Sequence, residues 1–356
     1  MIEITEYTPE TFWKLKEKWH LLEQGKEMTA FQKYHWYQNL NELYKKERVK
    51  KVCGRKWVYL LAEENGIPVM IAPFQICMHG FGYQQYGVRR GCYFIGRMGY
   101  TDYLNFIYSD FSEEACGALL NYVVEKYHQK TFIFEQIPEQ TSAHQYVVKI
   151  YHPSIRAISC AALFLPKTFE EYKKLLSKSR RQNIRTALNR ARKDQVELTH
   201  YMYLDENIEL KKSIKQLGEE GKKRKNQSSR QQMTLPGYIY SSCSSIIRKF
   251  FAAKQDVLFE AKETFCFCVK HGERMVGFYW GVRNDVVGEW YVILAGFDEN
   301  YARYTPCISH LYLYLQESYE KASCPFRILD FTRGGEAYKK SVGCTEKKVN
   351  TLTFSI

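Results

Sequence analysis

The chain has 356 residues, of which 45% are hydrophobic, and this length predicts two domains of ordinary size with sizeable cores. No apolar run approaches the roughly 20 residues that cross a bilayer, and the acidic start MIEITEYTPE lacks the pattern of a secretion signal. The sequence therefore shows neither a membrane-spanning segment nor a secretion signal, and it predicts a cytoplasmic location. The formal net charge is +13.

The positive charge is concentrated in two segments. Residues 173–193 carry nine basic residues and no acid, and residues 222–230 carry five more without an acid. The rest of the chain is nearly neutral, so the charge does not serve general solubility. This distribution indicates an anionic partner.

The eleven cysteines are scattered and form no CxxC pair, and the nine histidines are dispersed. Reduced, buried thiols are therefore expected rather than disulfides. No metal is expected, because no group of His, Cys and carboxylate residues has the spacing of a zinc site.

In chain order, the first group of predicted elements begins with a hairpin over 56–76, two apolar strands joined at Glu-Asn-Gly. A further strand is predicted over 99–108, a helix with three-to-four apolar spacing over 113–127, and a strand over 131–138. Because a helix between two strands is a crossover connection, the last two strands of this group should be parallel.

A basic helix is predicted next. Thr168 followed by Glu171 has the pattern of a capping box, and the helix is expected to run from there to about Asp194. Its cations recur on one face, and a solvated basic face is the alternative to a binding surface. The residues of that face are Lys174, Lys178, Arg181, Arg185 and Arg192.

The order of elements then recurs. A hairpin with a His-Gly-Glu turn is predicted over 264–282, a strand over 288–298, a helix over 307–322 and a strand over 326–334. The chain therefore predicts two copies of a mixed α/β unit. The expected division is 1–160 and 161–356.

Three patterns follow one another in a characteristic order. The first is Ser-x-x-x-Arg-x-x-hydrophobic-Arg from Ser177 to Arg185, with Asn189 where a further Arg is usual. The second is YVILAGFDENYARYTPCISHLYL over 291–313, a strand followed by Asp-x-x-Tyr, Thr-Pro and a helix. The third is DFTRGGEAYKK over 330–340. Together they resemble the GNAT superfamily in its tandem, CelD-like form and, more remotely, the Fem-type peptidyltransferases.

The resemblance implies two tandem GNAT-like domains, each a mixed, largely antiparallel sheet with flanking helices and a splayed parallel strand pair. It implies transfer of an acyl group, usually acetyl, from acetyl-CoA or another acyl-CoA to an amine. The donor's pantetheine would run beside the splayed strands of the second half, with its pyrophosphate at the next helix. The residues assigned to the donor are Tyr291, Leu294, Arg303, Tyr304, Thr305, Cys307, Ile308 and Ser309.

The start of that helix at Thr305-Pro306 agrees with such a site, because Pro suits the first helical position and the amides beyond it are open. Two features depart from the family pattern. Cys307 stands where Gly is common, and the Gln/Arg-x-x-Gly-x-Gly/Ala loop is absent. Cys307 as an acyl-carrying nucleophile is an alternative, because a helix N-terminus lowers the pKa of a thiol.

Direct transfer needs a base for the amine and donors for the oxyanion and the leaving thiolate. Asp330 and Glu336 are the candidate bases, and the choice between them is open. Tyr338 is the candidate acid for the thiolate, a role that GNAT tyrosines often take, and Lys339 is a candidate contact for the oxyanion or a phosphate. A capping acid and a core aromatic are the alternative interpretations of Asp330 and Tyr338.

The acceptor is expected to be an amine on a small molecule, a sugar or a peptide, and the basic helix is expected to meet CoA phosphates, tRNA or a lipid diphosphate. Two other functions stay open: Fem-type aminoacyl transfer from charged tRNA to a cell-wall precursor, and non-catalytic binding of RNA or another anion. The residues assigned to substrates are Tyr100, Asp102, Tyr103, Lys178, Arg181, Arg185 and Arg333.

Overall fold

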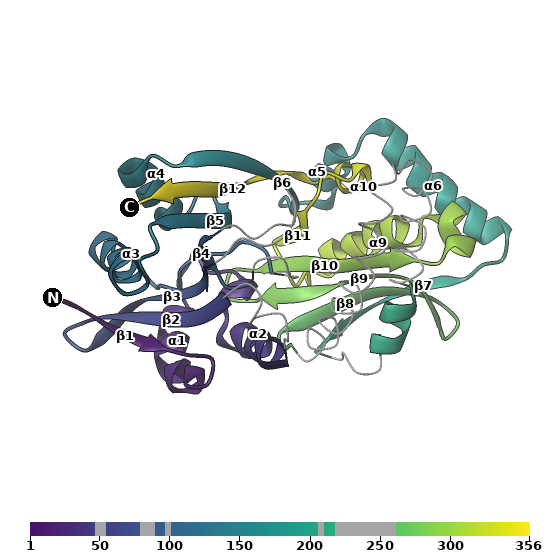
Figure 1. Ribbon diagram of the computed structural model, residues 1–356. Helices are drawn as coiled ribbons and strands as arrows, with labels where there is room; N and C mark the ends of the chain where they lie inside the picture. Colours follow the sequence, from purple (N-terminus) through teal and green to yellow (C-terminus); the bar gives the residue numbers. More distant parts are fainter. Residues whose placement is uncertain (47–54, 79–89, 97–100, 206–209, 218–260) are drawn as a thin grey trace, which may run out of the picture. The chain divides into compact units, whose positions relative to one another are not determined.

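The computed structural model describes residues 1–46, 55–78, 90–96, 101–205, 210–217 and 261–356 (Figure 1). The chain separates into two compact units. The first comprises residues 1–160 and 347–356, and the second comprises residues 161–346. The last ten residues thus return to the first unit, whereas the division expected from the sequence placed them in the second.

The first unit contains a mixed sheet with the strand order β1-β2-β3-β4-β5-β12. Neighbouring strands are antiparallel except β4 and β5, which are parallel at Cys92 and Phe132. The strands are β1 (Ile2–Tyr7), β2 (Arg55–Glu64), β3 (Ile67–Cys77), β4 (Gly91–Phe94), β5 (Thr131–Pro138) and β12 (Thr345–Ser355). The helices are η1 (Phe12–Leu15), α1 (Lys16–Leu22), η2 (Ala30–Gln32), α2 (Tyr34–Lys46), α3 (Glu113–Tyr127) and α4 (Ser142–Tyr151).

The predicted hairpin, helix and final strand of this unit are confirmed as β2–β3, α3 and β5. Asn65 and Gly66 both have positive φ, 52° and 77°, which a two-residue hairpin turn requires. The strand predicted over 99–108 is wrong. Residues 101–108 form a buried irregular segment, joined to β3 by a single bridge between Ile107 and Ile71, and the strand beside β5 is β4.

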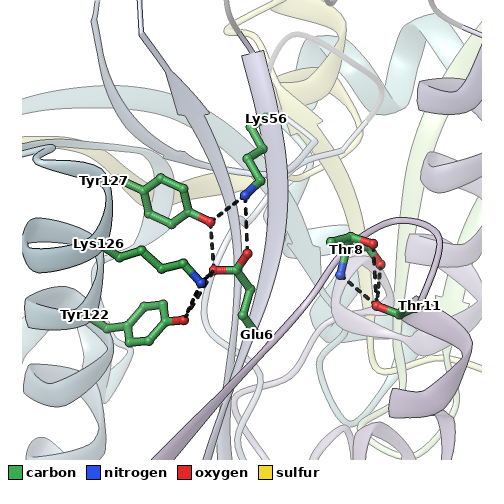
Figure 2. Close-up of polar contacts among 7 residues, drawn as sticks. All are labelled: Glu6, Thr8, Thr11, Lys56, Tyr122, Lys126 and Tyr127. Carbon is green, nitrogen blue, oxygen red and sulfur yellow. Dashed lines mark hydrogen bonds and ion pairs between the residues drawn. The ribbon is translucent and has the colours of Figure 1, made fainter.

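A carboxylate fixes the edge strand β1 to its neighbours (Figure 2). Glu6 accepts hydrogen bonds from the Tyr127 hydroxyl at 2.7 Å and the Tyr122 hydroxyl at 3.4 Å, and it pairs with Lys126 at 2.9 Å and Lys56 at 3.3 Å. The network joins β1, β2 and α3 around one side chain. It thus ties the edge strand to β2 and α3 through a side chain, in addition to the backbone pairing with β2.

The second unit contains the strand order β11-β10-β9-β8-β7. The β10–β11 pair is parallel, as the sequence predicted, and the others are antiparallel. The strands are β7 (Leu198–Leu204), β8 (Thr264–His271), β9 (Arg274–Asn284), β10 (Glu289–Phe297) and β11 (Ile328–Arg333), while β6 (Ser154–Phe164) crosses the boundary between the units. The helices are α5 (Phe169–Leu175), α6 (Lys178–Lys193), η5 (Glu299–Tyr304), α9 (Pro306–Glu320) and α10 (Ala337–Ser341).

The helix predicted over 168–194 is in fact two helices. The capping box of Thr168 and Glu171 is present at the start of α5. The chain then leaves helical geometry at Leu176, whose ψ is 132° and whose side chain is buried, and Ser177 caps α6 by accepting a hydrogen bond from the Arg180 amide at 3.1 Å. A new N-cap and a buried leucine therefore end one helix and begin the next.

Helix α9 lies against β7, β8 and β9, and α6 lies against α9 and η5 (Figure 1). Apolar residues from the sheet, α5, α6 and α9 form one core, among them Tyr172, Ile184, Phe267, Leu311 and Leu315. No helix among the described residues is long and apolar enough to cross a membrane.

Candidate functional site

The parallel strands β10 and β11 pair over only part of their length. Glu289–Tyr291 pair with Ile328–Asp330, and β10 then shifts register against β9 between Val292 and Leu294. Within the described residues no ladder pair joins β10 to β11 beyond Tyr291; instead the Thr332 hydroxyl donates to the Val292 carbonyl at 3.1 Å. The strands therefore part at the bulge, and among the described residues no strand pairs with the β11 side of the second half of β10, where Leu294 is only partly buried.

Helix α9 begins next to this opening with uncapped amides. Thr305 precedes it in the left-handed region, at φ 43° and ψ 55°, and makes no side-chain cap hydrogen bond. Pro306 is the first helical residue, and the first turn contains no acid. The amides of Cys307 and Ile308 and the positive end of the helix dipole thus favour an anion.

The corresponding helix of the first unit differs at its start. Ser112 caps α3 by accepting a hydrogen bond from the Ala115 amide at 3.1 Å, and Glu113 and Glu114 occupy the first turn. A side chain and two carboxylates already satisfy that helix end. Of these two crossover helices, α9 is the one whose N-terminus suits a phosphate.

The Cys307 side chain turns away from the helix end toward the sheet. Its thiol lies 3.5 Å from the Gly296 carbonyl and 3.9 Å from the Phe278 carbonyl, and a Cβ at Gly277 would approach Sγ to 2.7 Å. Burial raises the pKa of this thiol to about 12, opposite to the lowering expected from a helix N-terminus. Cys307 therefore points its thiol toward the sheet and stays protonated at neutral pH.

Several other residues assigned to the donor are already engaged. Ser309 is buried and donates to the Thr305 carbonyl at 2.9 Å, which tightens the first turn. Arg303 and Tyr304 both contact Asp194, at 3.2 Å and 2.8 Å. Tyr291 is fully buried, and its hydroxyl donates to Glu289. These side chains are therefore bonded to other residues of the chain, and the groups left for a donor are the uncapped backbone amides of the first turn of α9.

Asp330 occupies the point where the parallel strands part. It pairs with Tyr291 in the ladder and is fully buried, and its carboxylate accepts a hydrogen bond from the Thr332 amide at 2.7 Å. Thr332 has a φ of 53°, a rare conformation for a β-branched residue. Asp330 therefore supports a strained turn, and the sequence gave no signal that Thr332 would adopt it.

Lys339 is buried inside that turn. Its ammonium donates to the carbonyls of Arg333 at 2.6 Å and Gly334 at 3.1 Å, and it pairs with Glu336 at 3.0 Å. An ammonium has three protons, so these contacts occupy it. The structure corrects the expectation for Lys339: its side chain is 3% exposed and stabilises the turn from within instead of facing a substrate.

The turn exposes Glu336 and half-buries Tyr338. The Glu336 side chain is 43% exposed. Its carboxylate lies against the backbone of Gly334, which has a φ of 108°, and this close approach is possible because Gly334 has no Cβ: a Cβ there would lie 2.3 Å from Glu336 Oε2. Tyr338 packs edge-on against Phe331. Burial, and secondarily the charge of Glu336, raises the pKa of Tyr338, so the phenol is protonated at neutral pH.

The residues assigned to substrates fall in both units. Lys178, Arg181, Arg185 and Arg333 are exposed on the second unit. Two of the assigned residues, Asp102 and Tyr103, lie in the first unit and are buried. The Lys347 ammonium lies 4.6 Å from the Tyr103 ring centroid. Tyr100 lies outside the described residues.

The sequence predicted Asp194 only as the end of a helix, but not its contacts with Arg303 and Tyr304; it is the acid that ends an acid-free run from 172 to 193. That position marks it as a helix end, and the structure shows that it holds α6 to η5. The described parts of the chain contain no group of three or more His, Cys, Asp or Glu residues placed to hold a metal ion. The nine cysteines among them are all free thiols.

Comparisons with known proteins find a matching domain family and similar folds. Residues 178–340 match the acetyltransferase (GNAT) domain family, and no curated protein matches the chain. The solved structures that resemble it show the fold alone, because their sequences are 7–13% identical.

Three of these structures cover nearly the whole chain. A conserved protein of unknown function from Bacteroides thetaiotaomicron VPI-5482 has a TM-score of 0.51, with 9% identity and 100% of both chains covered. FemX has a TM-score of 0.50, with 13% identity and 99% of this chain and 97% of FemX covered. The C-terminal domain of a putative lysylphosphatidylglycerol synthetase from Agrobacterium fabrum has a TM-score of 0.50, with 10% identity and coverage of 96% and 92%.

The mixed α/β class predicted from the sequence is confirmed. Residues 178–340 contain α6, the bulged strand β10, helix α9 and most of the turn after β11. Residues 178–340 are therefore similar to the acetyltransferase (GNAT) domain family, and the fold of the chain is similar to that of FemX.

Proposed function

We propose that the protein transfers an acyl group from an acyl-CoA, such as acetyl-CoA, to an amine acceptor by direct attack. The observation that carries the proposal is the uncapped, acid-free start of α9 beside the parting strands β10 and β11. The pantetheine pairs with the open edge of β10, and a phosphate binds the amides of Cys307 and Ile308. The match of this segment to the GNAT domain family supports the same arrangement.

In the proposed reaction the amine nitrogen attacks the thioester carbonyl carbon. A C–N bond forms, the C–S bond breaks, the amine gives its proton to a base, and the thiolate takes a proton from an acid. Tyr338 suits the acid, because its raised pKa keeps the phenol protonated. Cys307 does not suit an acyl-enzyme, because its pKa of about 12 disfavours the thiolate.

Glu336 is the better of the two candidate bases. Its side chain is 43% exposed, whereas Asp330 is fully buried and already accepts the Thr332 amide. A base must reach the acceptor within hydrogen-bond distance, and the exposed carboxylate meets this condition with less rearrangement. Asp330 then has the separate role of holding the turn that carries Glu336 and Tyr338.

Isothermal titration with acetyl-CoA tests the proposal. A Thr305→Asp variant places a carboxylate over the open amides of α9, so it should weaken acetyl-CoA binding at least tenfold without lowering the melting temperature. Gln316→Glu adds the same charge near the other end of α9 and should change binding less than twofold. The proposal would be contradicted if the unmodified protein did not bind acetyl-CoA, or if both variants lost the same affinity for it.

A further inference from the structure

The exposed side of α6 carries an ordered row of side chains. At steps of four, three, four and three residues, the outer positions alternate between cation and amide over about 21 Å at 1.5 Å per residue. All five side chains are exposed. The row, called the α6 row below, consists of Lys178, Gln182, Arg185, Asn189 and Arg192.

Folding of the unit does not require these cations. The opposite side of α6 packs through Ile184, Ala187 and Ala191, which are all buried. In the part of the chain that the structure describes, Lys178 and Arg185 have no acidic partner, and Arg192 contacts only the Asn189 amide oxygen, at 3.3 Å. The cations of the row lie seven residues apart on one face, and Arg181 adds a like charge three residues from Lys178 and four from Arg185, spacings at which like charges repel. A row of cations without acidic neighbours indicates a partner with the opposite charge.

The α6 row ends beside the proposed donor site. Asp194, the C-cap of α6, accepts a hydrogen bond from the Tyr304 hydroxyl at 2.8 Å and pairs with Arg303 at 3.2 Å. Tyr304 is separated from the first residue of α9 by Thr305 alone. A partner lying along α6 is thus brought close to the start of α9, where the proposed function places the phosphate of the donor.

The segment before α9 offers little to a second phosphate. The amides of Asn300, Tyr301 and Thr305 are already bonded, to the Asp298 side chain, the Asp298 carbonyl and the Ala302 carbonyl, each at 3.0 Å. Phosphate contacts through the backbone are therefore concentrated in the first turn of α9. One turn suits a single phosphate, as 4′-phosphopantetheine has, better than the diphosphate and 3′-phosphate of CoA.

We propose that the α6 row docks an acidic carrier protein whose 4′-phosphopantetheine arm delivers the acyl group. The inference rests on the proposed function, because it requires a thioester donor at α9. Carboxylates at seven-residue spacing on a helix of the carrier match the cations of the row, and the amides of Gln182 and Asn189 hydrogen-bond to carboxylates between them. In the transfer, the acyl C–S bond breaks, the C–N bond forms, and the arm keeps its sulfur as a thiol.

A carrier protein fits better than a nucleic acid or a membrane surface. Neither of those presents a thioester arm to the adjacent site. In addition, none of the large exposed apolar side chains among the described residues lies on α6, and an interfacial membrane helix needs such side chains.

The test measures binding of a purified, acidic holo-acyl carrier protein to the full chain by fluorescence anisotropy, at low and high salt. The triple variant Lys178→Gln, Arg185→Gln, Arg192→Gln removes the row's cations. The triple variant Lys16→Gln, Lys26→Gln, Lys130→Gln removes the same charge from exposed positions of the first unit. Melting curves check that both variants are folded.

The proposal expects salt-sensitive binding by the unmodified protein, weakened at least tenfold in the first triple variant and less than twofold in the second. Equal weakening in both variants overturns it, as does tighter binding of a 20-nucleotide RNA or of vesicles with anionic lipid through the same row. Acetyl-CoA titration separates the two ideas. If acetyl-CoA binds and the carrier does not, the inference alone fails; if acetyl-CoA does not bind, the proposed function fails whether or not the carrier binds.

Discussion

The ammonium of Lys339 lies 2.6 Å from the carbonyl oxygen of Arg333, inside the turn that follows β11. This contact explains why a lysine next to the candidate acid Tyr338 is buried: it holds the backbone that presents Glu336 and Tyr338. A lysine in such a position acts as a positioning residue, and its replacement should mainly lower the stability of the turn.

The Lys339→Met variant should lose about 1–3 kcal/mol of unfolding free energy, because it leaves buried carbonyls without a donor. Urea unfolding followed by circular dichroism measures the change. Lys340→Met, at the exposed neighbouring position, should change stability by less than about 0.5 kcal/mol. Unchanged stability together with lost turnover would show instead that Lys339 touches substrate.

Cys307 should be unreactive in the folded protein. Burial raises the pKa of its thiol to about 12, so alkylation by iodoacetamide at pH 8 should require unfolding, as peptide mass spectrometry can show. A Cys307→Ala variant should keep its acyl transfer within about threefold, apart from losses through packing against Gly277. Rapid alkylation, or an acyl group recovered on this residue, would revive the acyl-enzyme alternative.

The Glu6 network should stabilise the first unit at neutral pH. Burial by itself raises the pKa of Glu6, but hydrogen bonds from Tyr127 and Lys126 and the charges of Lys56 and Lys126 outweigh it and lower the pKa. A lowered folded pKa gives stability that is present above the unfolded value near 4.5 and is lost as the pH falls through the folded value.

The Glu6→Gln variant should therefore be less stable by about 1–2 kcal/mol at pH 7, and the difference should shrink below pH 4.5. The control Glu42→Gln removes a more exposed ion pair with Lys45 and should cost less than about 0.5 kcal/mol. Urea unfolding at pH 7 and pH 4 compares the variants. A constant difference across this range would mean that the Glu6 charge is not the stabilising feature.

The histidine pair of the second unit, in which His310 is buried and His200 is partly buried, should make the protein acid-sensitive. His310 of α9 lies 3.3 Å from His200 of β7, Nδ1 to Nδ1, and burial followed by the charge of His200 lowers the pKa of His310 to about 4. Between pH 6.5 and 4 the unfolded state binds the proton and the folded state does not, so stability should fall as the pH falls through this window and be unaffected above it.

The expected loss from His310 between pH 6.5 and 4 is on the order of 2–3 kcal/mol. A His310→Gln variant should show a flatter decline over the same window, whatever its stability at pH 7. His20→Gln, at a more exposed histidine of the first unit, serves as the control and should decline as the unmodified protein does. Equal slopes in all three proteins would contradict a neutral buried His310.

Much of the fold could be predicted from the sequence because its signals are local. The hairpin turn at Asn65-Gly66, the capping box of Thr168 and Glu171, and the apolar spacing of α3 each specify their own structure. The break between α5 and α6 could not be predicted, because Ser177 becomes an N-cap only once Leu176 is drawn into the core. Local propensity favoured an unbroken helix there.

In the candidate site, too, the features set by local sequence could be predicted and those set by tertiary packing could not. The helix start at Thr305-Pro306 and the position of Asp330 at the end of a buried strand follow from sequence order. The burial of Lys339 and the strained φ of Thr332 depend on the conformation of the whole turn after β11, and neither a lysine nor a threonine predicts that conformation from sequence. The direction of the Cys307 side chain depends on the glycine at 277 of the facing strand.

Hydrogen–deuterium exchange with and without acetyl-CoA tests the central claim most directly, because it reports on the open amides themselves. Addition of acetyl-CoA should slow exchange in peptides that contain Cys307 and Ile308 and leave the first turn of α3 unchanged, since Ser112 and two glutamates already occupy that helix end. Binding of acetyl-CoA with no protection at 307–308, or with equal protection at 113–116, would contradict a donor site at α9.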